Sequence, residues 1–198
     1  MMKLLIATTN HGKILELADL LKELPCEILT PADLSLSLEV EESGTTYAEN
    51  AALKAEAFQR ASGLVTLADD TGLEVDALNG RPGVYSARYV DHPGATDADR
   101  RAKLLGELAA FPAPWTAHFH CTVAVAGLSA QTLLFNGDLY GEVVTEENGD
   151  YGFGYDRIFY VPEMEKTLAA CNMEEKNRIS HRALAVKAAL AELYLHCR

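Results

Sequence analysis

Two adjacent carboxylates, Asp69 and Asp70, follow the apolar segment 64–68. That segment predicts a buried strand, and α/β folds place ligands at the ends of such strands. Because strand side chains alternate between faces, we expect only one of the two carboxylates to point into a site. Carboxylates suit Mg²⁺, which often shares them with substrate phosphates. The alternative is a turn, since the sequence Asp-Asp-Thr-Gly is typical of turns.

A second candidate site is the turn formed by residues 8–13, between an expected strand and an expected helix. The backbone N–H groups of a helix start point at anions, and Lys13 adds a positive charge. The Walker pattern is absent, because position 7 is Ala and Ile14 follows Lys13. The alternatives are a phosphate-binding turn and a capped helix with a solvated lysine. The turn contains Thr8, Thr9, Asn10, His11, Gly12 and Lys13.

Whether two further groups of polar and charged residues belong to a site depends on where the fold places them. Glu41 and Glu42 lie in an acidic loop, and a charge run is usually solvated unless the fold brings it to Asp70. Asn50 and Lys54 are four residues apart on an Ala-rich helix and therefore share a face. An exposed lysine is the alternative interpretation of Lys54.

The segment 152–156, Gly-Phe-Gly-Tyr-Asp, could recognise a base. Glycines such as Gly154 allow close approach of a ligand to the backbone. Phe153 and Tyr155 offer stacking surfaces, and Asp156 could accept a hydrogen bond from a ring N–H. The alternative is a β-bulge or hairpin with two core aromatics.

Lys176 and the sequence Ser180-His181-Arg182 are the last candidates. Ser180 suits a helix N-cap, which puts His181 and Arg182 in the first turn. Cations there oppose the helix dipole, which indicates another use, such as donation to an acceptor on a ligand. The alternative is exposed surface residues.

The histidine and cysteine pattern argues against a zinc site or a redox motif. His118 and His120 share a face of an expected strand without a clear third ligand, which favours a half-buried strand. Four widely spaced cysteines in a chain without a secretory signal are expected to be reduced thiols in the cytosol. They are Cys26, Cys121, Cys171 and Cys197.

The composition sets outer limits on the function. The 198 residues include 17 basic and 29 acidic side chains, so the formal net charge is −12. The resulting negative electrostatic potential disfavours binding to a nucleic-acid polymer. The hydrophobic share of 48% excludes disorder as the main state, and the length predicts one domain over residues 1–198. The uncharged stretch 111–137 is too polar and too broken by prolines for a membrane span.

The order of the expected strands and helices along the chain predicts an α/β fold with a mixed sheet. A loop is expected at 35–44, and the segment 148–156 is rich in glycine. Thr46 and Glu49, like Thr96 and Asp99, form capping boxes, and Gly63 ends the helix that Thr46 begins. The terminal helix from Ser180 is expected to place Leu184, Ala188, Leu190 or Ala191, and Leu195 along one side. Strands are expected at 3–7, 26–29, 64–68, 116–126, 131–136 and 138–145, and helices at 11–24, 46–63, 96–111 and from residue 180.

Five motifs in one order resemble the inosine/xanthosine triphosphate pyrophosphatase family. They read TTNHGK, EESGTTYAENAALKA, ADDTGLEVDAL with GRPGVYSARY, GFGYD, and EEKNRISHR. The resemblance runs from Lys3 to beyond Arg182. It implies an elongated α/β mixed-sheet fold of two lobes with a central active-site cleft, a homodimer, and removal of deaminated purine nucleotides.

The resemblance also assigns roles to the acidic residues. Asp70 matches the catalytic carboxylate, which acts as general base and Mg²⁺ ligand. Glu42 is the better match for the other metal carboxylate, because it lies seven residues before Glu49, and Glu41 is its rival. Thr71 takes the place of a usual serine.

The substrate-binding positions follow in the same way. Residues 8–13 match the triphosphate-binding turn, and Lys54 matches a phosphate-side lysine. Arg157 stands where proline is usual, and Asp150-Tyr151 replaces a small or glycine pair, which leaves base preference more open than reaction type. The positions that match purine recognition are Phe153, Gly154, Tyr155, Asp156, Lys176, His181 and Arg182.

The implied reaction is Mg²⁺-dependent hydrolysis of ITP, dITP or XTP between the α and β phosphorus atoms. Arg182 and His181 donate while Asp156 accepts, which fits the O6 and N1–H of hypoxanthine and not adenine. Two alternatives stay open: a pyrophosphatase for other modified nucleotides, and a non-catalytic nucleotide-binding protein.

Overall fold

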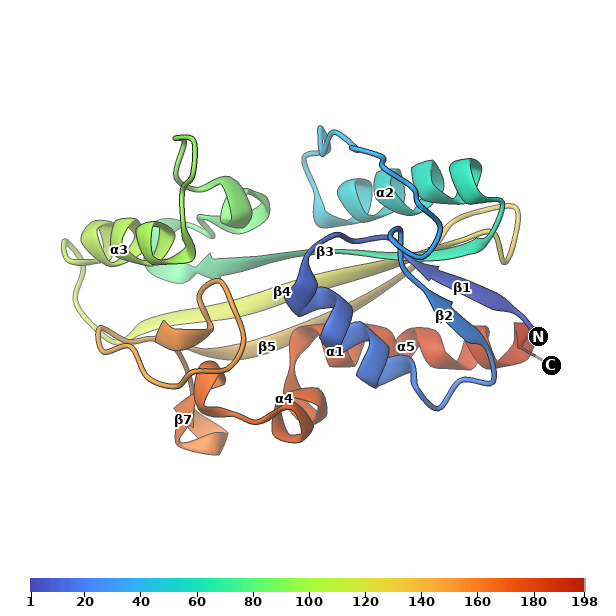
Figure 1. Ribbon diagram of the computed structural model, residues 1–198. Helices are drawn as coiled ribbons and strands as arrows, with labels where there is room; N and C mark the ends of the chain where they lie inside the picture. Colours follow the sequence, from blue (N-terminus) through green and yellow to red (C-terminus); the bar gives the residue numbers. More distant parts are fainter. Residues whose placement is uncertain (198) are drawn as a thin grey trace. The chain divides into compact units, whose positions relative to one another are not determined.

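A seven-stranded mixed sheet organises the computed structural model, which describes residues 1–197 (Figure 1). The strand order is β2-β1-β3-β4-β5-β6-β7. β2, β1 and β3 are parallel, whereas β5, β6 and β7 are antiparallel, so the predicted mixed α/β sheet is confirmed. The strands are β1 Lys3–Ile6, β2 Glu27–Leu29, β3 Val65–Val75, β4 Trp115–Ala126, β5 Leu133–Val143, β6 Phe159–Val161 and β7 Lys166–Thr167.

Helices begin where the sequence supplies capping side chains. Asn10, Thr46, Thr96 and Ser180 each accept a hydrogen bond from a backbone N–H in the first turn, and both predicted capping boxes are present. Gly63 ends α2 with a φ of 69°. The α-helices are α1 His11–Leu21, α2 Tyr47–Ser62, α3 Asp97–Leu108, α4 Met173–Ile179 and α5 His181–His196. No helix among residues 1–197 combines the length and the apolar character that crossing a membrane requires.

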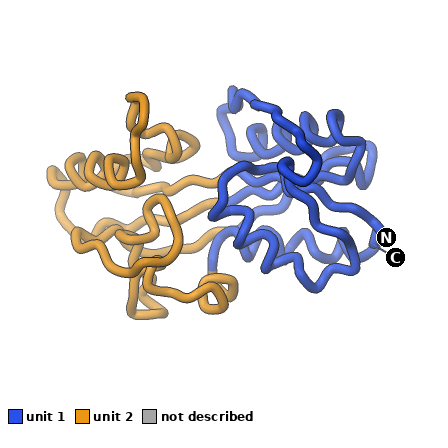
Figure 2. Tube along the Cα trace, viewed as in Figure 1, with its two compact units in different colours: residues 1–70, 121–137, 180–198 blue, residues 71–120, 138–179 orange. Residues whose placement is uncertain are grey.

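The chain divides into two compact units, which Figure 2 colours separately. Unit 1 comprises residues 1–70, 121–137 and the C-terminal residues from Ser180. Unit 2 comprises residues 71–120 and 138–179.

Unit 1 buries both faces of its part of the sheet, with α1 and α5 on one side and α2 on the other (Figure 1). Leu4 and Ile6 of β1 belong to the cluster with α1 and α5, whereas Leu5 belongs to the cluster with Ala51 and Phe58 of α2. This alternation explains why β1 is a continuous apolar run, as expected for a strand covered on both faces. Unit 2 has its own core, built from β3, β4, β5, α3 and the segments after β5.

Two predictions of strand ends were wrong. Residues 69–72 neither follow a strand nor form a turn, because β3 runs on from Val65 to Val75. The expected strands 131–136 and 138–145 are one strand, β5, which passes through Gly137. A Cβ at Gly137 would lie 2.3 Å from the His181 carbonyl oxygen and 2.6 Å from the Ala185 nitrogen. The glycine is therefore needed for the close approach of α5 to β5, and it does not form a turn.

The buried side of α5 also differs from the expected one. Leu184 and Leu195 are 39% and 63% exposed, and Ala188 is exposed as well. The buried side instead carries small residues that let the helix lie close to β5 at Gly137. It includes Ala185, Val186, Ala189 and Leu193.

The Gly137→Ala substitution is expected to lower the free energy of unfolding by about 1–3 kcal/mol, because the new methyl group meets backbone atoms that cannot move independently. Gly106→Ala is the matched control. Gly106 lies inside α3 with no atom within 4 Å of a built Cβ, so alanine should raise stability by about 0.5–1 kcal/mol. Urea unfolding of both variants measures the difference. Equal effects of the two substitutions would contradict the close approach of α5.

Candidate active site

Asp69 and Asp70 point to opposite faces of β3, as strand alternation predicts. The side chain of Asp69 is completely buried, and that of Asp70 is 8% exposed. Asp69 contacts residues of α1 and α5, whereas Asp70 contacts residues of α2. Two neighbouring carboxylates in one strand therefore occupy two different environments.

Asp69 belongs to a buried network of charges. Lys13 Nζ lies 3.1 Å from Asp69 Oδ2, and Arg182 Nε donates to the same oxygen at 3.1 Å. The Nη1 atom of Arg182 donates to Glu16 Oε2. Glu16, Asp69 and Arg182 are each at most 4% exposed at the side chain, so the network joins α1, β3 and α5 inside unit 1.

The charges around Asp69 decide its ionisation. Burial raises the pKa of Asp69, but the positive charges of Lys13, Arg182 and Lys54 outweigh burial and hold the pKa well below its ordinary value. Asp69 therefore stays an anion and is poorly suited to take a proton. Its position favours a role in fixing Lys13 and Arg182.

The ionisation of Asp69 should make the free energy of unfolding depend on pH in the acidic range. Because its pKa is lower in the folded chain than the unfolded value of about 3.9, the ionised carboxylate stabilises the fold above that value. This contribution is lost as the pH falls from the unfolded pKa towards the folded one. We expect the gap in unfolding free energy between wild type and Asp69→Asn to narrow as the pH falls from about 5 to about 2. Urea unfolding at several pH values measures it, and a constant gap would contradict the network.

On the other face of β3, Asp70 meets Asn50, Lys54 and Glu42. Asn50 Nδ2 donates to Asp70 Oδ2 at 3.2 Å, and Lys54 Nζ lies 3.5 Å from Asp70 Oδ1. Lys54 also donates to Glu42 Oε1 at 2.5 Å. The fold thus brings the acidic loop to Asp70 through Lys54, and Glu42 is the loop glutamate that reaches this lysine, whereas Glu41 is exposed.

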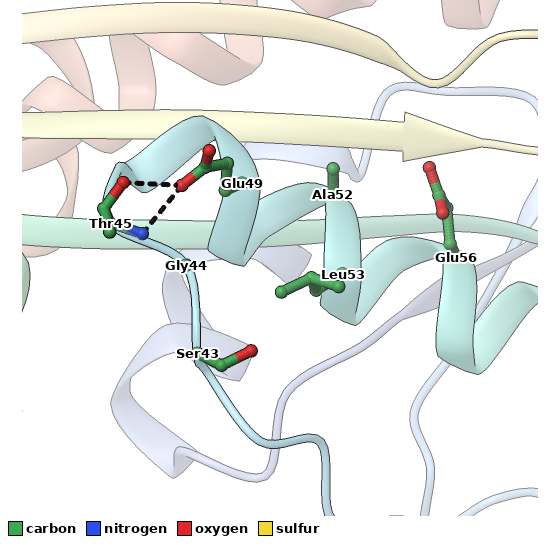
Figure 3. Close-up of a pocket in the computed structure, with 7 residues that line it drawn as sticks. All are labelled: Ser43, Gly44, Thr45, Glu49, Ala52, Leu53 and Glu56. Carbon is green, nitrogen blue, oxygen red and sulfur yellow. Dashed lines mark hydrogen bonds between the residues drawn. The ribbon is translucent and has the colours of Figure 1, made fainter.

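The loop before α2 is fixed by the first turn of that helix. Gly44 N–H donates to Asn50 Oδ1 at 2.8 Å, and a Cβ at Gly44 would lie 2.6 Å from that oxygen. Both the N–H and the hydroxyl of Thr45 donate to Glu49 Oε2, as Figure 3 shows beside a hollow along α2. Asn50 therefore links the loop that carries Glu42 to Asp70.

The environment of Asp70 suits proton transfer. Burial raises the pKa of Asp70 above its ordinary value, Glu42 raises it further, and Lys54 and Lys13 act in the opposite direction. A carboxylate with a raised pKa is a better base near neutral pH than an ordinary aspartate.

The donor set on this face fits Mg²⁺. Glu42 and Asp70 offer carboxylate oxygens, and both already share one cationic group, the ammonium of Lys54. Among residues 1–197, no group of three or more His, Cys, Asp or Glu side chains is placed to hold a metal ion. Mg²⁺ is commonly held by one or two carboxylates together with substrate phosphates, so this pair is sufficient when a phosphate completes the set.

The residues of the segment 152–156 lie in unit 2 and make a second cluster. Lys176 Nζ donates to Asp156 Oδ2 at 2.6 Å, and the N–H of Phe153 donates to the same oxygen at 3.0 Å. Lys176 Nζ also lies 5.3 Å from the centre of the Phe153 ring, within the range of a cation–π contact. The buried Asp156–Lys176 pair thus holds Phe153 beside a positive charge.

Comparison with known proteins identifies the chain. The Ham1 family model matches residues 4–192, nearly the whole sequence. The chain belongs to the Ham1 family. A "dITP/XTP pyrophosphatase" of Desulforamulus reducens is 46% identical over 98% of each chain, and one of Geobacter sulfurreducens is 44% identical over 94% of each chain. A solved HAM1 protein from Coxiella burnetii is similar with a TM-score of 0.86 and 39% identity over 99% of each chain.

Membership of the Ham1 family confirms the resemblance found in the motifs, and the structure locates the motif residues. The turn 8–13 opens α1, where Asn10 Oδ1 accepts from Lys13 N–H at 3.1 Å. Thr71 is half-buried and follows Asp70 in β3. His181 is buried in the first turn of α5 in unit 1.

The structure buries two of the residues that match purine recognition. Tyr155 is 4% exposed, packs in the unit 2 core and donates its hydroxyl to the Ser86 carbonyl, which agrees with the alternative of a core aromatic. Burial also raises its pKa. Arg182 is 1% exposed and bonded to Asp69 and Glu16, so those carboxylates take two of its donor groups.

The structure adds residues to the site that the motifs did not single out. Glu16 lies three residues after Lys13 on α1, and this spacing is the one sequence signal that placed it near Lys13. Asp97 and Arg101 of α3 bond to the backbone of Gly154, and Glu147 bonds to Arg101. No local pattern indicates these contacts, because the partners are 46–57 residues apart.

Proposed function

We propose that this chain is a nucleoside triphosphate pyrophosphatase that hydrolyses ITP, dITP and XTP to the monophosphate and pyrophosphate, with Mg²⁺ as cofactor. The observation that carries the proposal is the arrangement around Asp70: a buried carboxylate with a raised pKa, placed with Lys54 and Glu42. The names of the relatives, dITP/XTP pyrophosphatase, support the same substrate class.

The phosphate side uses the charges of unit 1. A triphosphate is strongly anionic and the protein carries a formal charge of −12, so binding needs local positive charge. Lys54, Lys13 and the start of α1 supply it. Mg²⁺, held by Glu42 and Asp70 together with phosphate oxygens, would screen the phosphate charge and orient the attacking water.

Asp70 then acts as the general base. Its raised pKa brings the carboxylate closer to the proton affinity that a base needs near neutral pH, and the proton of the attacking water passes to it. Asn50, which donates to Asp70 Oδ2 at 3.2 Å, orients the carboxylate. Asp69 keeps its charge and holds Lys13 on the opposite face of β3.

The cluster of Lys176 and Phe153 suits recognition of a base. Hypoxanthine and xanthine present an acceptor at O6, where adenine presents an amine donor. Lys176 can only donate, so it favours an acceptor at that position, and Phe153 provides a flat surface for the ring. A site built to donate rejects an analogue that also donates, because buried donors are left unpaired.

A substrate panel tests this proposal. Initial rates of pyrophosphate release are measured on ITP, XTP, GTP and ATP, with Mg²⁺ and with EDTA. We expect release from ITP and XTP that EDTA abolishes, with little from ATP, whose 6-amino group is a donor. Turnover of other modified nucleotides alone would identify a different pyrophosphatase, and nucleotide binding without any turnover would identify a binding protein. The resemblance also predicts a homodimer, which light scattering of the purified chain tests.

A further inference from the structure

The loop that carries Phe153 is rich in glycine. Gly149, Gly152 and Gly154 all have positive φ angles, and glycine loses more conformational freedom on folding than any other residue. Tyr151 is 61% exposed and Gly152 is also exposed, so burial does not fix this part of the loop. Contacts with neighbouring elements therefore add to the hydrogen bonds inside the loop, such as that from Phe153 N–H to Asp156 Oδ2.

Helix α3 holds both backbone groups of one loop residue. Gly154 N–H donates to Asp97 Oδ2 at 2.7 Å, and Arg101 Nη1 donates to the Gly154 carbonyl oxygen at 2.8 Å. Asp97 and Arg101 are four residues apart and share one face of α3. The peptide groups on both sides of Gly154 are therefore fixed by a single helix face.

The guanidinium of Arg101 also reaches the start of the same loop. Its Nε and Nη2 atoms donate to the two carboxylate oxygens of Glu147 at 2.7 and 3.0 Å. Such bidentate, charge-assisted hydrogen bonds are stronger than hydrogen bonds between neutral groups. Because the side chain of Arg101 is 9% exposed, the planar group is held in one orientation, and it ties Glu147 to Gly154 across the loop.

We propose that Asp97 and Arg101 are positioning residues for base recognition: by fixing Gly154 they set the place of Phe153 beside Lys176. This inference rests on the proposed function, because it gives the loop its role from the purine substrate. Neither residue belongs to the motifs that suggested the substrate class, and both act through the Gly154 backbone rather than by touching the base.

A nearby ion pair provides the matched control. Arg157 lies 3.7 Å from Glu147 and 3.5 Å from Asp150, on side chains that are 43%, 39% and 95% exposed. Exposed pairs of this length contribute little, so Arg157 lies in the same charge cluster without holding Gly154.

The first test separates substrate binding from catalysis. Lysine at position 101 keeps the charge but lacks the planar fork that reaches Glu147 and Gly154 together. We expect Arg101→Lys to raise KM for ITP about 10-fold or more while kcat changes less, since a lost charge-assisted hydrogen bond typically costs that much. Asp97→Ala should act likewise, and Asp97→Asn, which keeps an acceptor oxygen, should recover most of the loss. Arg157→Ala should stay within about twofold of wild type, because its pair is exposed.

The second test measures how firmly the loop is held in the absence of substrate. The N–H of Gly154 donates to Asp97, so amide hydrogen exchange at Gly154 should be much faster in Asp97→Ala than in wild type or in Arg157→Ala, while exchange in β4 stays unchanged. If wild type releases no pyrophosphate from ITP, the proposed function fails, but this exchange experiment still tests the loop contacts. Unchanged exchange at Gly154 in the Asp97→Ala variant would overturn the inference. So would an unchanged KM in an active enzyme.

Discussion

Asp70→Asn is expected to lower kcat for pyrophosphate release from ITP by about 10²- to 10⁴-fold, the range that a general base contributes. The substitution keeps the shape of the side chain and the contact with Asn50, but the amide can neither accept the proton nor serve as an anionic metal ligand. In the absence of Mg²⁺, removing this negative charge should not weaken binding of an anionic substrate. A non-hydrolysable ITP analogue should therefore bind the variant in EDTA about as well as it binds wild type.

The control for this variant is Asp19→Asn, which removes the same charge from an exposed i,i+3 pair with Lys22 in unit 1. It should leave turnover unchanged. Turnover of Asp70→Asn near the wild-type value would rule out Asp70 as the base. A large loss of both analogue binding and folded protein would show instead that Asp70 mainly supports the structure.

Arg182→Met is expected to lower the free energy of unfolding by about 3–5 kcal/mol, the cost of breaking a buried ion pair by removing one partner. Methionine retains much of the length of the side chain, so the loss comes chiefly from the charge. Asp69 and Glu16 would then lose the buried cation that they share inside unit 1. Urea unfolding followed by circular dichroism measures the change.

Two further variants test the cause of that loss. Arg178→Ala removes an arginine from an exposed pair with Glu174 and should cost less than about 1 kcal/mol. Adding Asp69→Asn and Glu16→Gln to Arg182→Met removes the two carboxylate charges that Arg182 had neutralised and should restore part of the stability. An Arg182→Met protein as stable as wild type, or a triple variant less stable than the single one, would contradict the charge network.

Local patterns predicted the parts of the fold that depend on near neighbours. The capping boxes at Thr46 and Thr96, the glycine end of α2 and the serine cap of α5 all lie within a few residues of the groups they bond, and the structure confirms them. The expectation that Asp69 and Asp70 face opposite ways followed from strand geometry alone, and it also holds.

Contacts between distant segments were outside the reach of such patterns. Arg182 bonds to Asp69, 113 residues away, and to Glu16, 166 residues away, so its place in a buried network could not be read from the first turn of α5. Gly137 resembled a strand break because its role is set by α5, which comes much later in the chain. Tyr155 resembled a stacking surface for the same reason, since its core neighbours come from four strands and α3.

Product analysis of ITP hydrolysis by wild type in the presence of Mg²⁺ shows directly which phosphoanhydride bond is broken. We expect inosine monophosphate and pyrophosphate in equal amounts from the first turnover, with rates that fall in Asp70→Asn and stay unchanged in Asp19→Asn. Inosine diphosphate and orthophosphate as the first products would contradict the proposed function, because the bond broken would then lie between the β and γ phosphorus atoms.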